Sequence, residues 1–238
     1  MEAVVTMSDY SDFLALLGFG GAHPGGIELT KKLIDDHRIN KPEKILEVGC
    51  GTGQTSAFLT MSGFDITPID CHPLMVEKAN KRFRELNLKC HALQKDIHES
   101  IFQPNSFDVI LAESVLTFTN LKKSIPQLSK LLKKNGKIIA IEMTKTENLS
   151  KELENDLKNF YHLPQILSEA EWNKIMKDNR LETEVKGLDL NSLPSSEQEL
   201  DPSDNIEKKY FDILIKHEEL VMKSLNTLKA SIIVAKKV

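Results

Sequence analysis

Cysteine, excess basic charge and long apolar runs are all scarce in this chain of 238 residues. Its three cysteines, Cys50, Cys71 and Cys90, form no C-x-x-C pair, which excludes the usual zinc and dithiol motifs and favours a reducing compartment. The 31 basic residues are outnumbered by 35 acidic ones, so the net charge of −4 offers no electrostatic footprint for nucleic acid. No apolar run approaches the ~20 residues of a membrane helix, and the first residues lack the pattern of a signal peptide. These absences predict a cytoplasmic protein that acts on neither nucleic acid nor a membrane.

The remaining composition is that of an ordinary globular protein, with 40% apolar and 28% charged residues. A chain of this length fits one α/β domain with an elaborated lid better than two independent domains. We expect residues 1–40 to form an N-terminal helical lid and residues 41–143 to form a ligand-binding core. Residues 144–238 are expected to add lid helices and the last two strands.

Strand-like and helical segments alternate along most of the chain, which predicts βαβ units and a mainly parallel sheet with helices on both faces. The expected strands are Lys44–Val48, Phe64–Asp70, Lys89–Leu93, Phe107–Ala112, Lys137–Glu142, Leu181–Leu190 and Ser231–Ala235. The expected helices are Asp9–Leu17, Ile27–Ile39, Thr55–Ser62, Pro73–Leu86, Leu121–Leu132, Leu149–Tyr161, Ser168–Met176 and Ile206–Leu225. Asn135-Gly136 is expected to form a turn, Ser168 and Glu171 a capping box, and residues 191–205 an exposed loop.

The first predicted strand ends in three glycines at alternate positions, Gly49, Gly51 and Gly53, and a helix follows. Glycine lets a backbone turn sharply and approach a ligand closely, while a helix N-terminus supplies free N–H groups. The spacing differs from the G-x-G-x-x-G of nicotinamide and flavin enzymes. Glu47, two residues before Gly49, would repel a pyrophosphate but suits a ligand with an ammonium and a sulfonium group. A plain tight turn and a dinucleotide site remain the alternatives.

The segment 47–53 resembles the first motif of the class I S-adenosylmethionine-dependent methyltransferases, in particular the small-molecule enzymes called type 11. The resemblance covers about residues 41–143, and it implies a Rossmann-like three-layer αβα sandwich. The sheet in that fold has seven strands and is mostly parallel, with an antiparallel last strand. The resemblance also implies S-adenosylmethionine as cofactor, with Glu47 binding its amino group. The following residues would surround its methionine moiety and ribose: Gly49, Cys50, Gly51, Thr52 and Gly53.

Two further acids occupy places where the same resemblance implies cofactor contacts. Asp70, at the end of the second predicted strand, would accept both ribose hydroxyls, although it could instead cap the following helix. Cys71 and Met75 would approach the adenine. Asp96 would accept the exocyclic amine and Ile97 would cover the ring, unless Asp96 is a plain turn residue.

The glycine-dense segment 18–26 is the most distinctive stretch outside this core, and a loop of this kind could close over the site as a gate. His23 in this loop is a candidate base or acceptor contact, with an exposed hinge as the alternative. Glu113, after the fourth predicted strand, would face the sulfonium or the acceptor, or else be solvated. His23 and Glu113 are therefore the candidate catalytic residues. Other residues expected to line the lid are Tyr10, Phe19, Gly25 and Gly26.

The acceptor of the methyl group is expected to be a small molecule. Residues 113–116 do not carry the Asn/Asp-Pro-Pro-Tyr/Phe signature of enzymes that methylate amino groups of adenine or glutamine, and no metal-ligand pattern is present. The alternatives are a protein or RNA methyltransferase, a thiol or arsenite methyltransferase, and a catalytically silent protein that only binds S-adenosylmethionine.

Overall fold

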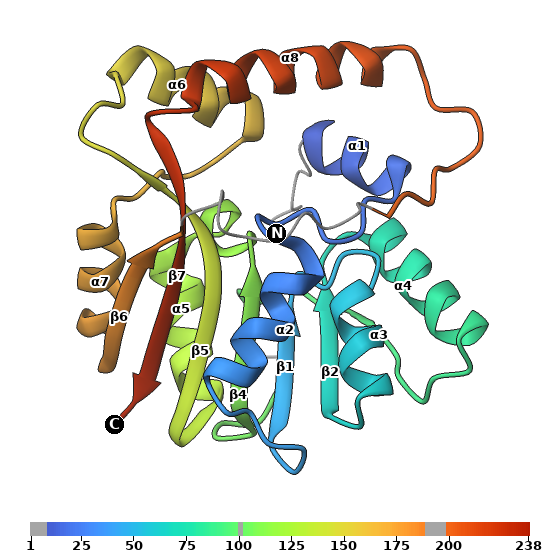
Figure 1. The fold of residues 1–238 in the computed structure, drawn as a ribbon, viewed down its shortest axis with the longest axis vertical. Helices are drawn as coiled ribbons and strands as arrows, with labels where there is room; N and C mark the ends of the chain where they lie inside the picture. Colours follow the sequence, from blue (N-terminus) through green and yellow to red (C-terminus); the bar gives the residue numbers. More distant parts are fainter. Residues whose placement is uncertain (1–8, 100–101, 189–198) are drawn as a thin grey trace.

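Seven strands form one sheet in the order β3-β2-β1-β4-β5-β7-β6 (Figure 1). They are β1 (Lys44–Val48), β2 (Asp65–Asp70), β3 (Leu93–Gln94), β4 (Phe107–Glu113), β5 (Leu132–Lys145), β6 (Leu181–Gly187) and β7 (Leu228–Lys237). β7 pairs antiparallel with β5 and with β6, and the other four pairs are parallel. The predicted mostly parallel sheet with an antiparallel last strand is confirmed. This computed structural model describes residues 9–99, 102–188 and 199–238.

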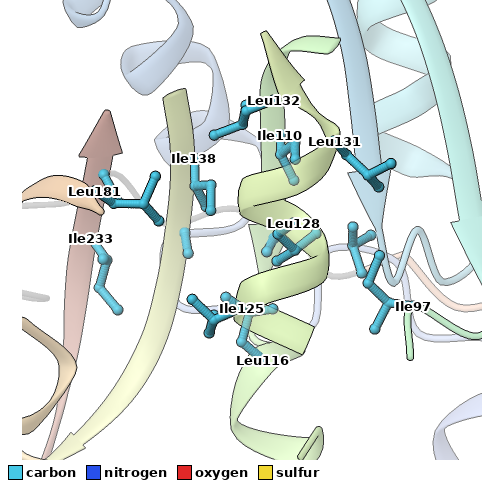
Figure 2. Close-up of a cluster of buried hydrophobic side chains, with 14 of the residues drawn as sticks. Ile97, Ile110, Leu116, Ile125, Leu128, Leu131, Leu132, Ile138, Leu181 and Ile233 are labelled. Carbon is cyan, nitrogen blue, oxygen red and sulfur yellow. The ribbon is translucent and has the colours of Figure 1, made fainter. Parts of the chain in front are cut away.

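Helices cover both faces of the sheet, as predicted for a three-layer sandwich. The helices of the described residues, not all of which lie on these faces, are α1 (Asp9–Leu17), α2 (Gly26–Asp36), α3 (Gln54–Met61), α4 (Pro73–Glu85), α5 (Leu121–Leu131), α6 (Lys151–Tyr161), α7 (Glu169–Asp178), α8 (Lys209–Ser224) and the short 3₁₀ helix η1 (Leu116–Phe118). On one face, α2 and α3 bury Leu29 and Leu59 against β1 and β4. On the other, Ile125 and Leu128 of α5 pack against Ile110 of β4 and the neighbouring strands (Figure 2). Burying such side chains contributes about 1.5–3 kcal/mol each.

Three predicted strands differ clearly from the structure. β7 extends three residues before and two residues after the predicted Ser231–Ala235. The other two strands differ for local reasons. β3 has only two residues, because the Asn80 side chain pairs with both backbone groups of Ala92 at 2.9 and 3.0 Å and leaves them unavailable to a strand. β5 begins at Leu132 rather than after the predicted turn. Asn135 has a φ of 64°, and the pairing with β4 shifts register there, so the predicted turn is an irregularity within the strand.

Most helix ends lie within two residues of the prediction, but α2 ends at Asp36, three residues before the predicted Ile39. The capping box of Ser168 and Glu171 is confirmed at the start of α7. α8 begins at Lys209, three residues later than predicted, and the described part of β6 ends at Gly187. Most of the predicted loop 191–205 lies outside the described residues.

α1, α6 and α8 lie beyond the carboxyl ends of the parallel strands (Figure 1). Their apolar faces share a separate cluster that buries Tyr161 and Leu220 and includes the half-buried Tyr10. Among the residues that the structure describes, no helix is long and apolar enough to cross a membrane. This third helical group places side chains over the edge of the sheet at which β1, β2 and β4 end.

Candidate active site

Three acids stand at the carboxyl ends of adjacent strands: Glu47 on β1, Asp70 on β2 and Glu113 on β4. The chain leaves β1 toward β2 on one side and returns to β4 on the other, so the strand order reverses at this point. In open α/β sheets, ligands bind in the crevice at such a reversal. Glu47, Asp70 and Glu113 therefore stand where a ligand-binding crevice is expected in this sheet.

The three glycines that follow β1 all have positive φ, at 72° for Gly49, 52° for Gly51 and 78° for Gly53. A Cβ at Gly49 would lie 2.6 Å from Val115, and one at Gly53 would lie 2.8 Å from Phe83. A Cβ at Gly51 would meet no atom within 4 Å. Protein packing thus requires the outer two glycines, whereas the middle one borders open space where a ligand can touch backbone.

Asp70 is oriented by two backbone donors. The N–H of Gly51 donates to Oδ2 at 2.9 Å and the N–H of His72 donates to Oδ1 at 2.8 Å. The N-cap of α4 is His72, whose ring nitrogen accepts from the N–H of Leu74, so the alternative of Asp70 as helix cap is wrong. Burial raises the pKa of the Asp70 carboxyl above its usual value, against the two backbone hydrogen bonds.

Glu47 is buried at 3% exposure, and the Ser56 hydroxyl of α3 donates to its carboxylate. Burial, followed by the nearby carboxylate of Glu113 and, more weakly, that of Asp70, raises the pKa of Glu47 well above its usual value. A buried carboxylate of this kind is poorly compensated by the protein alone. A cationic ligand group beside it would restore its ionised form.

Glu113 and His23 meet although 90 positions separate them. Thr30 of α2 and Thr55 of α3 donate to the two carboxylate oxygens of Glu113 at 2.5 and 2.8 Å. His23 Nε2 lies 3.4 Å from Glu113 Oε2, with side-chain exposures of 5% for His23 and 10% for Glu113. The alternatives of a solvated Glu113 and an exposed His23 are therefore wrong.

The residues expected near the adenine lie around the ends of β2 and β3. Asp96 Oδ1 accepts from the backbone N–H of His98 at 2.9 Å and lies 2.8 Å from its ring Nδ1, so Asp96 does organise a turn. Ile97 is buried in the core, Cys71 is exposed, and Met75 is half-buried in the first turn of α4.

Cys50 is unsuited to a thiolate site. It is buried, and burial raises the pKa of its thiol well above the usual value. In the described ranges, no group of three or more His, Cys, Asp or Glu side chains is arranged to hold a metal ion.

The expected lid residues do not all face the site. Tyr10 packs its ring against Tyr161 at 4.7 Å and stacks on His217 at 5.2 Å, so it belongs to the contacts between α1, α6 and α8. The carbonyl of Phe19 accepts from the Thr52 hydroxyl at 3.4 Å, which brings the segment 18–26 onto the glycine loop. Gly25, at a φ of 80°, is the N-cap of α2, and Gly26 begins that helix.

Sequence reasoning missed Glu142, a fully buried acid near the end of β5. It accepts from the backbone N–H groups of Val115, Leu116 and Thr117 at 2.7–3.1 Å, and from the Thr117 hydroxyl at 2.6 Å. Burial raises the pKa of Glu142 to about 7 against these four hydrogen bonds. Because Val115 packs on Gly49, Glu142 supports the loop that lies against the glycine turn. Its signal in the sequence was an acid ending an apolar strand, the same pattern that marks Glu47 and Glu113.

A second missed feature is the strap, residues 199–203, which crosses the segment 16–20. The N–H of Gly20 donates to the carbonyl of Glu199 at 2.9 Å, and Asp201 and Ser203 donate backbone N–H groups to Gly18 and Leu16. Three basic side chains of α4 contact the strap. These contacts are Arg82 with Glu199 at 2.5 Å, Lys81 with Asp201 at 3.1 Å, and Lys78 with the carbonyl of Asp201.

Comparisons with known proteins agree with this geometry. A family model described as a methyltransferase domain matches residues 39–185. The uncharacterized methyltransferase YodH of Bacillus subtilis is 34% identical over 219 residues, which cover 90% of this chain and 93% of that protein. A ubiquinone biosynthesis O-methyltransferase of Rickettsia prowazekii is 30% identical over 198 residues, covering 79% and 77%.

A solved structure shows the same fold. The phosphoethanolamine N-methyltransferase 2 of Haemonchus contortus, in complex with S-adenosyl-L-methionine, has a TM-score of 0.78 to this chain at 16% identity. The match covers 99% of this chain and 61% of that one. The sequence matches above and the observed sheet order together decide the family. The chain belongs to the methyltransferase-domain family, and the resemblance of its motifs to the class I S-adenosylmethionine-dependent methyltransferases is confirmed.

Proposed function

We propose that this protein transfers the methyl group of S-adenosylmethionine to a small-molecule acceptor by in-line displacement. The observation that carries the proposal is the intact set of Glu47, the 49–53 turn and Asp70 at the reversal of strand order. A silent binding protein would have no need for the further buried pair of His23 and Glu113 beside this set.

The residues present fit the cofactor. Gly51 borders open space, so backbone is accessible to a ligand there, and Asp70 is held by backbone donors at a fixed orientation beside it. Its carboxylate retains lone pairs for two ribose hydroxyls. Glu47, buried and with a raised pKa, suits an ammonium group. Asp96 and Met75 would complete the adenine end.

The chain's own contribution to the reaction is positioning and exclusion of water. The cofactor supplies an activated methyl group on a sulfonium. Segment 18–26 covers the end of β4 and keeps His23 and Glu113 almost free of solvent. Holding two reactants in line in such a site supplies on the order of 7–11 kcal/mol of the barrier reduction.

The proposal of a small acceptor rests on enclosure and charge. The side chains of His23 and Glu113 are only 5% and 10% exposed, and residues 199–203 pair with the adjoining segment 16–20. An enclosed pair of this kind favours a small acceptor. The net charge of −4 disfavours RNA. The relative from Rickettsia prowazekii is named for a small-molecule pathway.

Calorimetric titration with S-adenosylmethionine, S-adenosylhomocysteine and NADH tests the proposal. We expect micromolar binding of the first two, lost by at least tenfold in Asp70→Asn. Asp65→Asn is the matched control, because Asp65 is exposed at the opposite end of the same strand. Binding of NADH alone would overturn the proposal, and binding of both adenosyl ligands without turnover of any small nucleophile would favour a silent protein.

A further inference from the structure

His23 is held in one orientation by its own loop. Its carbonyl accepts from the N–H of Gly26 at 3.0 Å, which closes a turn at the start of α2. Its ring Nδ1 lies 3.3 Å from the carbonyl of Pro24. A carbonyl can only accept, so in the neutral ring this contact places the proton on Nδ1 and the lone pair on Nε2.

His23 Nε2 is buried and has no hydrogen-bond partner among the described residues. Glu113 Oε2 lies 3.4 Å from Nε2, and Glu113 is close enough to Glu47 to raise the pKa of the Glu47 carboxyl. Thr30 and Thr55 already donate to Glu113. With the proton on Nδ1, Nε2 and Oε2 are both acceptors, and neither can satisfy the other. A buried nitrogen left unpaired is destabilising, so the arrangement with a neutral ring lacks one donor.

We propose that the missing donor is a hydroxyl group of the methyl acceptor, and that His23 Nε2 takes its proton during transfer. This rests on the proposed function above. The O–H bond breaks and the proton goes to Nε2, while the oxygen's electron pair forms the new bond to the methyl carbon. The electron pair of the broken S–CH₃ bond stays on sulfur, which leaves S-adenosylhomocysteine, and the proton later passes to solvent.

Glu113 is what makes this proton transfer favourable. The Glu113 carboxylate lies 3.4 Å from Nε2 and attracts the imidazolium that forms, and little solvent is present to screen this interaction. Once protonated, Nε2 can donate a hydrogen bond to Glu113 Oε2, so neither atom is left without a partner.

The same charge selects the kind of acceptor. A neutral hydroxyl keeps its proton at neutral pH and needs a base to become a good nucleophile. A thiolate or other anion arrives without a proton for Nε2 and is repelled by Glu113, whereas a neutral hydroxyl supplies the donor and becomes negative only as its proton passes to His23. A hydroxyl compound meets both requirements, because it is neutral when it binds and it carries a proton that it can donate to Nε2.

The test uses 4-nitrophenol, which is coloured only as the phenolate, added at pH 6 to the S-adenosylhomocysteine complex. We expect the phenolate absorption to appear on binding to the wild-type complex and to fall at least tenfold in His23→Gln. Glu113→Gln, which keeps shape and removes the charge, should lower the signal several-fold. His91→Gln, at an exposed position, is the matched control and should leave it unchanged.

Calorimetry with S-adenosylhomocysteine separates this inference from the proposed function. If wild type fails to bind that ligand, the proposed function fails. If wild type and His23→Gln bind it equally and give the same phenolate signal, or if 4-nitrophenol does not bind or stays neutral, the role of His23 is overturned. Stronger binding of 4-nitroaniline than of 4-nitrophenol, with no proton transfer, would also overturn the hydroxyl class.

Discussion

The glycines after β1 differ in what a side chain would meet, and this separates ligand binding from folding at single positions. Gly51→Ala places its Cβ in open space, so it adds only the strain of a positive φ, about 1 kcal/mol. We expect a small loss of stability. We also expect at least a tenfold loss of affinity for S-adenosylmethionine, because the alanine side chain fills the space through which the cofactor would contact the backbone at position 51.

Gly53→Ala should behave in the opposite way. Its Cβ would meet the Phe83 ring at 2.8 Å and Ala79 at 3.0 Å, in addition to the strain of a φ of 78°. We expect the free energy of unfolding to fall by about 2–4 kcal/mol. Urea denaturation of both variants measures this, and equal stabilities would contradict the assignment of packing to Gly53 and ligand space to Gly51.

Glu47 predicts a pH dependence of cofactor binding. Burial and the neighbouring carboxylates raise its pKa well above the usual value, so part of the protein carries a neutral Glu47 below that pKa. A cationic amino group requires the ionised form, so affinity for S-adenosylmethionine should rise as pH rises through the raised pKa of Glu47. Calorimetry should find that the affinity of Glu47→Gln changes less with pH than that of wild type. The same pH dependence in both proteins would show that a group other than Glu47 causes it.

The residues that sequence reasoning identified are those whose role is visible in local spacing. Glu47 and Gly51 stand a few positions apart, and Asp70 ends the next strand. The hydrogen-bond partners of Glu113 could not be predicted from local spacing. Thr30 and Thr55 lie 83 and 58 positions from Glu113 along the chain and come close to it only when β1 and β4 pair.

At the scale of elements, Glu142 ties the end of β5 to η1. Glu142→Ala would leave four buried donors without an acceptor, and we expect a loss of at least about 3 kcal/mol of stability. Glu182→Ala, at an exposed position on β6, is the control and should change stability by less than about 0.5 kcal/mol.

The pKa of Glu142 adds a pH dependence with a definite sign. Burial raises the pKa to about 7 from 4.5, so the folded state binds the proton more tightly than the unfolded chain does. This contribution to stability is complete below pH 4.5 and is lost as pH rises to about 7, on the order of 3 kcal/mol in total. Relative to wild type, Glu142→Gln should therefore gain stability with rising pH across this window. A pH-independent difference would show that the four donors keep the pKa near its ordinary value.

The element boundaries show where sequence patterns are insufficient. The apolar runs of β1 and β4 predicted their strands almost to the residue, since both are buried between helix layers. β3 was overestimated because one side chain, Asn80, takes the backbone groups of Ala92. Such a contact between α4 and the chain after it has no periodic signature.

At the scale of the whole molecule, the three layers and the mostly parallel sheet follow from the alternation of elements and from the family resemblance, but the closure over the site does not. That closure joins three distant parts of the chain: the segment 16–20, α4, and the strap at residues 199–203. The residues involved are charged and glycine-rich, and individually they are typical of solvated surface.

We expect exchange of the cofactor to depend on salt concentration. The strap pairs with segment 16–20, and Glu199 and Asp201 of the strap form ion pairs with basic side chains of α4. Partly exposed ion pairs contribute about 0.2–1 kcal/mol each and weaken with salt. Glu199→Gln with Asp201→Asn should therefore speed release of S-adenosylhomocysteine by roughly three- to tenfold at low salt. Salt should speed release from wild type toward the rate of the double variant. Surface plasmon resonance measures both rates, with Glu219→Gln on α8 as control for loss of an exposed ion pair. The double variant could instead release the ligand at the wild-type rate and with the same salt dependence. That result would show that the ligand leaves without displacement of the strap, and that segment 18–26 opens near His23 instead.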